Sequence, residues 1–187
     1  MPINKEKWGT KYQNRNIEVF VVSALKVSQK FAPDSKAKKI HWRLSGGYNT
    51  DSGSESTIFD TANVENQGPY VEIDFYTRGY IASHNATKNL EFQVLKDYTS
   101  NDVANLVRQR RLNVFRYNAQ GTGCRTWTAR LIEELEDEGV IPRDSVTRFR
   151  QAVEESNLPE AEIQKVQISR KTQSGSDEQK PQKRRHK

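Results

Sequence analysis

The chain contains one cysteine, Cys124, whose surroundings favour a reactive thiolate. Cys124 follows two glycines in the stretch "AQGTGCRTWT", residues 119–128, and begins a segment with helical periodicity. Backbone N–H groups and the positive end of the dipole at a helix N-terminus stabilise a thiolate, and the adjacent Arg125 adds a positive charge. The same N–H groups, next to Gly123, could hold an oxyanion. The pattern indicates a nucleophile, although a lone cysteine is also a common small core residue.

A cysteine nucleophile needs a base, and His41 is the best-placed histidine. Residues 38–47, "KKIHWRLSGG", alternate apolar and polar side chains, which predicts a strand with His41 on its polar face, next to Trp42. His84 falls in a turn sequence and His186 in the C-terminal tail. His41 could equally be an ordinary strand histidine with a satisfied hydrogen bond.

A third polar group would have to orient the imidazole. Asp74 and Glu72 lie on the polar face of another predicted strand, "YVEIDFYTR", residues 70–78. We take Asp74 as the first choice and Glu72 as the second, because a single sequence does not fix the register between two strands.

Other site chemistries have no matching pattern. One cysteine and two usable histidines give no zinc spacing, so no metal is expected. The stretch "GTGCRTW" lacks the lysine of a phosphate-binding loop, and no clear buried strand leads into it as a dinucleotide fold requires. We therefore expect no cofactor.

The order of the predicted elements indicates an α+β fold. Short connections favour an antiparallel sheet of about five strands, predicted over residues 17–25, 38–47, 70–78, 79–83 and 89–98. Residues 46–69 are rich in Gly, Ser, Asn, Asp and Thr and are predicted to form a long loop that could cover a substrate. Helical periodicity then predicts two or three helices, over residues 99–111, 124–139 and 143–157, with Gly139 as a C-terminal stop.

Charge separates the body of the chain from its C-terminal end. The formal net charge is +6, and residues 170–187 carry seven Lys/Arg against two Asp/Glu, which leaves about +1 for residues 1–169. The composition divides the chain into an N-terminal polar segment (1–16), a single α+β domain (17–168) and a disordered basic tail (169–187). The tail sequence "KPQKRRHK" could serve nuclear import or bind an anionic partner, or it could simply be solvated.

Hydropathy and cysteine content predict the compartment. No apolar run reaches the length of a membrane-spanning helix, and the first residues are too polar for a signal peptide. A single cysteine cannot form an internal disulfide, so a soluble protein of a reducing compartment, cytoplasmic or nuclear, is expected.

The order of a strand histidine, a polar residue on a later strand and a cysteine opening a helix resembles the circularly permuted papain-like group, which includes the lecithin retinol acyltransferase-like proteins. The matching residues are His41, Cys124 and Trp127, with Asp74 in the third position. More narrowly, "HWRL", "VEIDF" and "GTGCRTWTARLIEELEDEGVI" resemble an uncharacterised family of small filamentous-fungal proteins. The resemblance implies a permuted papain-like fold.

Two functions of different class follow. The first is a cysteine-dependent hydrolase or acyltransferase acting on an amide, ester or thioester, with Cys124 as nucleophile, His41 as acid and base, and Asp74 as orienting residue. Its substrate would contact Trp42, Gly123, Arg125 and Trp127. The second is a non-catalytic domain of the same fold that binds a small molecule or a protein and keeps Cys124 as a structural residue.

Overall fold

The computed structural model describes residues 3–4, 8–28, 38–50, 53–63, 71–115 and 123–156. The chain divides into two compact units, Met1–Arg150 and Gln151–Lys187. The first unit holds the sheet and most of the helical residues. The basic tail predicted over residues 169–187 lies outside the described residues.

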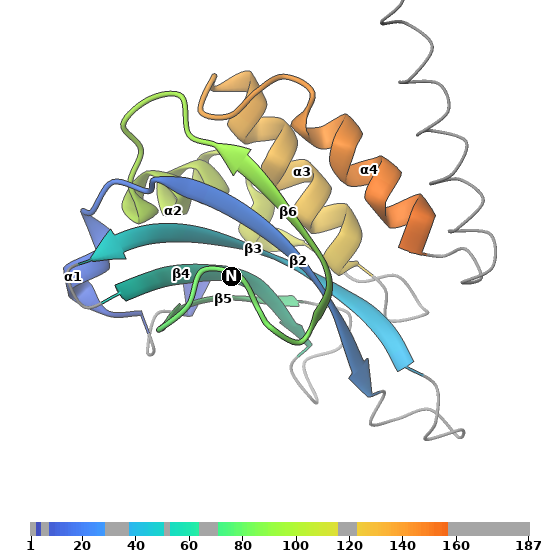
Figure 1. Cartoon of the computed structure of the whole chain (residues 1–187). Coiled ribbons are helices and arrows are strands. Elements are labelled where there is room, and N and C mark those ends of the chain that lie inside the picture. The colour runs from blue at the N-terminus through green and yellow to red at the C-terminus, as the bar shows by residue number, and fades with distance from the viewer. Residues whose placement is uncertain are drawn as a thin grey trace, which may run out of the picture. The chain divides into compact units, whose positions relative to one another are not determined.

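The described residues form one six-stranded sheet and several helices (Figure 1). The strand order is β1-β5-β4-β3-β2-β6; β1 is parallel to β5 and all other pairs are antiparallel. The mixed α+β class predicted from the sequence is confirmed. The strands are β1 (Ile3–Asn4), β2 (Val19–Ser28), β3 (Lys38–Thr50), β4 (Gly53–Asn63), β5 (Val71–Arg78) and β6 (Ala86–Gln93). The helices are α1 (Thr10–Gln13), α2 (Ser100–Gln109), the 3-10 turn η1 (Leu112–Val114), α3 (Cys124–Asp137) and α4 (Ser145–Ser156).

Local chemistry sets the helix boundaries. Thr99 precedes α2 and forms a capping box with Asp102, so two backbone N–H groups of the first turn are satisfied by side chains. Beyond the end of α3, Gly139 has a φ of 66°, a left-handed conformation that glycine adopts without steric strain. The C-terminal stop predicted at Gly139 is therefore seen.

One face of the sheet carries the apolar core beneath the helices. Phe59 and Phe75 lie on neighbouring strands with ring centroids 4.8 Å apart, and both side chains are buried. Trp42 of β3 meets Phe149 of α4 edge to face at 5.1 Å. Figure 1 shows α2 and α3 on the same side of the sheet. Since side chains alternate along a strand, His41 on β3 points away from this core.

The opposite face is crossed by the connection between β5 and β6, residues 79–85 (Figure 1). Ser56 Oγ donates to the carbonyl of Tyr80 at 2.6 Å, and Ser45 Oγ lies 3.0 Å from the carbonyl oxygen of Ile81. A Cβ atom added to Gly47 would come within 2.7 Å of the Ile81 side chain, so the glycine allows the connection to lie directly on the sheet.

Three expectations about the strands are wrong. The described part of residues 46–69 forms strands and not a long loop: β3 extends to Thr50, and β4 is a central strand over Gly53–Asn63. Residues 51–52 and 64–69 lie outside the described residues. Ser56, Thr57 and Thr61 are buried within it, since strand hydroxyls can hydrogen-bond while their backbone completes the sheet. Conversely, residues 79–83, predicted as a strand, belong to the connection that crosses the sheet. The sheet has six described strands rather than about five.

The segment 1–16, which composition set apart as polar, contributes to the core. Trp8 and Tyr12 are each 4% exposed. Trp8 packs edge to face on Phe75 at 5.3 Å, and Tyr12 stacks on Tyr48 at 5.5 Å.

In the part of the chain that is described, no helix is long and apolar enough to cross a membrane.

Candidate active site

His41 and Asp60 meet where two central strands separate. The β3–β4 ladder runs from Thr50↔Gly53 to Leu44↔Phe59, and beyond that point no β3–β4 pairing joins the described residues, although both strands continue. His41 and Asp60 lie in these continuing parts, and His41 Nε2 is 2.7 Å from Asp60 Oδ1. Their side chains are 21% and 14% exposed, so the pair is sheltered but open to solvent on one side.

Cys124 completes a hydrogen-bonded chain with these two residues. It is the first residue of α3, and its thiol is hydrogen-bonded to the His41 side chain. Because Nε2 of the ring is engaged by Asp60, Nδ1 is the nitrogen left to face the sulfur. The order Asp60–His41–Cys124 is that of an orienting acid, a base and a nucleophile.

The electrostatics of the chain favour the charged forms of both His41 and Cys124. Burial lowers the pKa of His41, but the hydrogen bonds and charges of Asp60 and Cys124 outweigh it and raise the pKa from 6.5 to about 10. Burial raises the pKa of the Cys124 thiol, but His41 and two backbone N–H groups outweigh it and hold the pKa below 9.0. The arrangement is that of a thiolate–imidazolium pair.

The backbone contributes to this stabilisation. The two N–H groups that bind the sulfur belong to Trp42 and Arg125. The N-cap of α3 is Gly123, which makes no side-chain cap, and the first intrahelical bond joins the Trp127 N–H to the Gly123 carbonyl at 2.9 Å. The N–H groups that precede it in the first turn are therefore available to the sulfur and to a negatively charged oxygen beside it.

Asp60 is itself fixed by two further donors. The Thr61 N–H donates to Oδ1 at 2.7 Å, and the Tyr76 hydroxyl donates to Oδ2 at 3.2 Å. With His41 on Oδ1 as well, the carboxylate is held through both oxygens. This fixes the direction in which Asp60 presents its charge to the imidazole.

The structure brings two of the three residues chosen from the sequence together and replaces the third. His41 and Cys124 are in contact, whereas the acid on His41 is Asp60 and not Asp74. Asp74 is one strand further away, opposite Asp60 in the β4–β5 register. The sequence analysis does not identify Asp60 because it predicts a loop where the structure has β4. The signal that could have revealed it is the β-branched and aromatic run "STIF" that precedes it.

Of the four residues expected to contact a substrate, two are buried in the core and two lie at the thiol. Trp42 and Trp127 are each 1% exposed, and their side chains belong to the core. The Trp127 indole N–H donates to the Leu112 carbonyl at 3.1 Å, which is a structural bond. Gly123 and Arg125 do lie at the thiol, with Gly123 as the N-cap and Arg125 as an N–H donor. No cluster of His, Cys, Asp and Glu that could hold a metal ion occurs within the described ranges.

Residues 20–176 match a family model whose description is Domain of unknown function (DUF7770). The chain belongs to the DUF7770 family. No curated protein matches the chain. No solved structure matches it either.

The DUF7770 match contains the complete candidate site. His41, Asp60 and Cys124 all fall within it, as does almost the whole sheet. The matched range also includes Tyr76, which holds Asp60. The site therefore belongs to the DUF7770 domain itself and not to a segment outside it.

Proposed function

We propose that this DUF7770 protein is a cysteine-dependent hydrolase or acyltransferase, acting on an amide, ester or thioester. Cys124 is the nucleophile, His41 the acid and base, and Asp60 the residue that orients the imidazole. The observation that carries this proposal is the hydrogen-bonded chain Asp60–His41–Cys124 at the N-terminus of α3. It combines a favoured thiolate, a proton carrier and donors for an oxyanion in one place.

The reaction would proceed in two acyl-transfer steps. The Cys124 thiolate attacks the acyl carbon, and the C–S bond forms as the carbonyl becomes an oxyanion. Collapse of this intermediate breaks the bond to the leaving group, which takes its proton from the His41 imidazolium. His41 then removes a proton from water or another acceptor, which attacks the thioester and releases Cys124. In a hydrolase the acceptor is water, and in an acyltransferase it is an amine, alcohol or thiol.

The helix terminus supplies the oxyanion site in this mechanism. The Cys124 N–H lies in the uncapped first turn of α3, next to the attacking sulfur. The positive end of the helix dipole adds to its effect, since the charge develops at the oxygen bonded to the attacked carbon.

The layout also supports a permuted papain-like architecture. The histidine lies on β3, the acid on the following β4, and the cysteine opens a later helix, so the chain order is histidine, acid, cysteine. A reducing compartment, cytoplasmic or nuclear, would keep the thiol free for this chemistry. An anionic partner of the basic tail remains a separate hypothesis, since that segment lies outside the described residues.

Alkylation of Cys124 by iodoacetamide tests the chemical premise. With one cysteine in the chain, all thiol labelling reports on Cys124, and Cys124→Ser is the blank. Rates are measured from pH 4 to 9 in the wild type and in His41→Ala. We expect rapid labelling of the wild type well below pH 8.5, and a shift of the profile toward the reference thiol value of about 8.5 in His41→Ala.

Acylation tests the reaction itself. Incubation with p-nitrophenyl acetate should give a burst of nitrophenol equal to the amount of protein, with one acetyl group per chain by intact mass. Cys124→Ser and His41→Ala should lose the burst. Slow alkylation that accelerates only on unfolding would instead indicate a structural thiol and the alternative function, a non-catalytic binding domain.

A further inference from the structure

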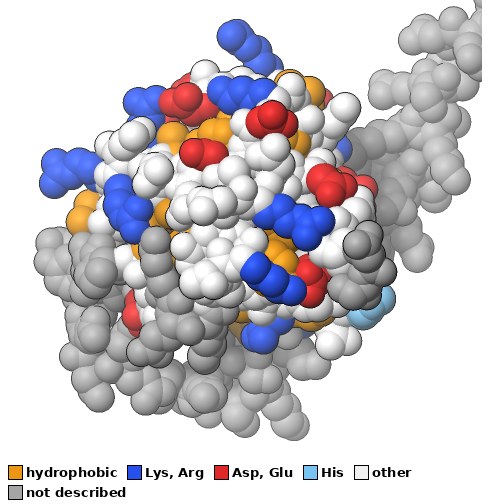
Figure 2. Space-filling model, turned by 90° about the vertical axis from the view of Figure 1, so that its left-hand side faces the viewer, with side chains coloured by type: hydrophobic (Ala, Val, Ile, Leu, Met, Phe, Trp, Pro, Cys, Tyr) orange, Lys and Arg blue, Asp and Glu red, His pale blue; other side chains and the backbone are white. Residues whose placement is uncertain are grey.

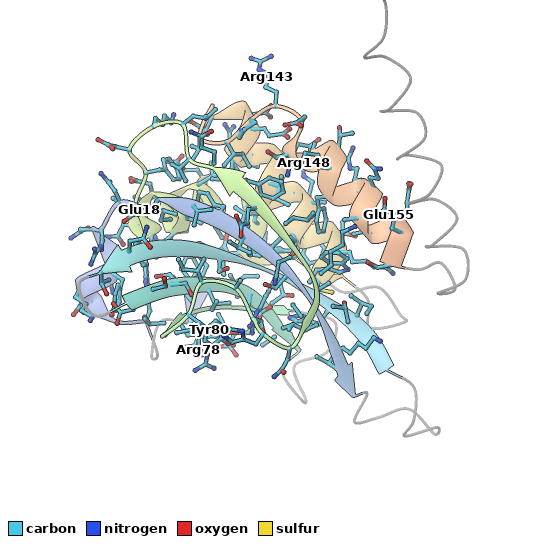
Figure 3. The ribbon with its side chains drawn as sticks, viewed as in Figure 1. Glu18, Arg78, Tyr80, Arg143, Arg148 and Glu155 are labelled. Carbon is cyan, nitrogen blue, oxygen red and sulfur yellow. The ribbon has the colours of Figure 1, made fainter. Side chains whose placement is uncertain are left out.

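A second group of polar side chains lies behind Asp60, on the face of the sheet away from the helices. Its members are Arg43, Tyr76 and Tyr80, which we call the tyrosine–arginine cluster. Arg43 is two residues from His41 on β3, so both side chains leave the same face of the strand. Tyr80 belongs to the connection that crosses this face. In Figure 3 it lies on the other side of the sheet from Arg148 of α4.

The hydrogen bonds of the cluster connect Arg43 to Asp60, and the donor of each bond can be assigned. The Tyr76 hydroxyl donates to Asp60 Oδ2 at 3.2 Å, since a carboxylate can only accept. Arg43 Nη1 lies 3.4 Å from the Tyr76 oxygen, and Arg43 Nη2 lies 3.2 Å from the Tyr80 oxygen; arginine can only donate. The bonds therefore form a continuous path from Arg43 through Tyr76 and Asp60 to His41.

The protonation states of Tyr76 and Arg43 agree with these assigned donors and acceptors. Burial and the charge of Asp60 raise the pKa of Tyr76, so its hydroxyl keeps its proton and remains a donor. Arg43 forms no ion pair with any carboxylate of the described residues, and the two tyrosine oxygens are its hydrogen-bond acceptors there. The guanidinium thus acts on Asp60 through the Tyr76 hydroxyl and through its charge at longer range.

We infer that Tyr76 and Arg43 are positioning residues of the candidate active site: Tyr76 fixes the Asp60 carboxylate so that its Oδ1 faces His41, and Arg43 fixes Tyr76. The inference rests on the proposed function, because it assigns these residues to the Asp60–His41–Cys124 chain. With Tyr76, a third strand contributes to the candidate active site: Tyr76 lies on β5, while His41 and Asp60 lie on β3 and β4.

The purely structural alternative is that the cluster only attaches the 79–85 connection to the sheet. That role is already served by Ser56, which donates to the Tyr80 carbonyl, and by the contact between Gly47 and Ile81. A structural cluster would affect stability alone. A positioning cluster also changes the protonation of His41, which is a separate observable.

The test is an NMR titration of His41 in the wild type, Tyr76→Phe and Arg43→Lys, with the His41 signal assigned from its loss in His41→Ala. Tyr76→Phe removes the hydroxyl and keeps the ring. We expect the pKa of His41 to fall by about one unit, a tenfold loss of proton affinity, because Asp60 is no longer held toward the ring. The alkylation rate of Cys124 near pH 6 should change little, because His41 stays protonated at that pH even with its pKa lowered by one unit.

Arg43→Lys keeps the positive charge and removes the planar fork that reaches two hydroxyls. It should give a smaller fall in the pKa of His41, and the double variant with Tyr76→Phe should fall no further than Tyr76→Phe alone. A neutral substitution of Arg43 would not be a clean test, because the loss of a nearby positive charge raises the pKa of His41 directly. Tyr98→Phe is the matched control: its half-buried hydroxyl lies 3.5 Å from the Asp102 carbonyl, and Tyr98 makes no contact with the site.

The outcomes separate the two proposals. An unchanged His41 titration in Tyr76→Phe and in Arg43→Lys, with normal wild-type reactivity, would overturn the positioning role and leave the proposed function standing. A wild-type His41 that titrates at its ordinary value, with a slow thiol, would overturn both. If Tyr76→Phe does not fold, Arg43→Lys alone decides, since it still predicts a lower pKa.

Discussion

Thr128 donates from its Oγ1 to the backbone carbonyl of Trp42 at 3.3 Å. Helix α3 therefore binds β3 along the part of its edge that is not paired with β4. The N–H of Trp42, on the same edge, binds the Cys124 sulfur. Helix α3 therefore replaces a strand as the hydrogen-bonding neighbour of β3 at this one residue. This substitution brings the N-terminus of the helix to His41, two elements that lie far apart in the sequence.

Thr128→Val should test how much the site depends on this bond. Valine has a similar shape but no hydroxyl, so the buried Trp42 carbonyl loses a donor and the free energy of unfolding should fall by about 1–2 kcal/mol. The alkylation rate of Cys124 at pH 6 should fall as well, because the helix start is less firmly held. Thr126→Val, on the exposed side of the same helix, is the control and should stay within about 0.5 kcal/mol of the wild type. Equal effects of the two changes would contradict this account.

Asp60→Asn should uncouple His41 from its acid. The amide can still accept a hydrogen bond, but it has no charge to stabilise the imidazolium, so the pKa of His41 should fall from about 10 toward 6.5. Thiolate formation at pH 6–7 should weaken with it, and we expect an alkylation rate about tenfold lower.

Asp74→Asn is the matched control for Asp60→Asn. It removes a carboxylate from the opposite position of the neighbouring strand, on the same face of the sheet. The pH profile of Cys124 should stay close to that of the wild type. A larger change in Asp74→Asn than in Asp60→Asn would instead identify Asp74 as the orienting residue, as predicted from the sequence.

The sequence revealed the parts of the site that lie on regular amphipathic elements. Alternation over residues 38–47 placed His41 opposite the core, and the apolar stripe of α3 placed Cys124 at a helix start. Both signals are strong because a single buried face determines which residues are apolar. Neither signal says which strand approaches His41, since strand order and register depend on contacts between distant segments.

The missed acid shows where this reasoning fails. Strand β4 buries hydroxyl side chains on both faces, Ser56 and Thr57 among them, so its composition is that of a loop. The converse error at residues 79–83 has the same origin: "GYIAS" is apolar because Ile81 packs on Gly47, not because it pairs in the sheet.

On the face shown in Figure 2 acidic and basic side chains are interspersed, as the near-neutral charge of the body predicts.

Trp127→Phe should distinguish a core residue from a substrate contact. Phenylalanine keeps an aromatic ring in the core but cannot donate to the Leu112 carbonyl, so unfolding should become easier by about 1–3 kcal/mol. The alkylation rate per folded molecule and the size of the acylation burst should be unchanged. A variant that keeps its stability but binds acyl substrates more weakly would return Trp127 to the substrate site.

Gly47→Ala should disturb the connection that carries Tyr80. The new Cβ would lie 2.7 Å from Ile81 Cγ2, and such overpacking costs about 1–3 kcal/mol. In an Ile81→Ala background the clash is absent, so adding Gly47→Ala should cost much less there. Gly79→Ala is the control, since nothing lies within 4 Å of a Cβ at that position. Additive effects of Gly47→Ala and Ile81→Ala in urea unfolding would disprove direct contact.

The thiolate–imidazolium pair also predicts how stability depends on pH. The pKa of His41 is raised to about 10 in the folded protein, so its contribution is complete below pH 6.5 and is lost as the pH rises through about 10. The pKa of Cys124 is lowered, so its contribution is present above pH 9.0 and is lost as the pH falls through the folded value. In the pH range where the His41 contribution is being lost and the Cys124 contribution is being gained, the folded and unfolded chains hold the same number of protons. The two pH dependences cancel there, so stability changes little with pH.

Cys124→Ser removes one half of this balance. Serine does not ionise, so only the His41 contribution remains, and the stability of the variant should begin to fall above pH 6.5 with a slope of up to about 1.4 kcal/mol per pH unit. The difference between wild type and Cys124→Ser in urea unfolding should therefore widen as the pH rises from the folded pKa of Cys124 to 9.0. Parallel curves would mean that folding does not lower the pKa of Cys124, and the thiol would then lack the activation on which the proposed chemistry depends.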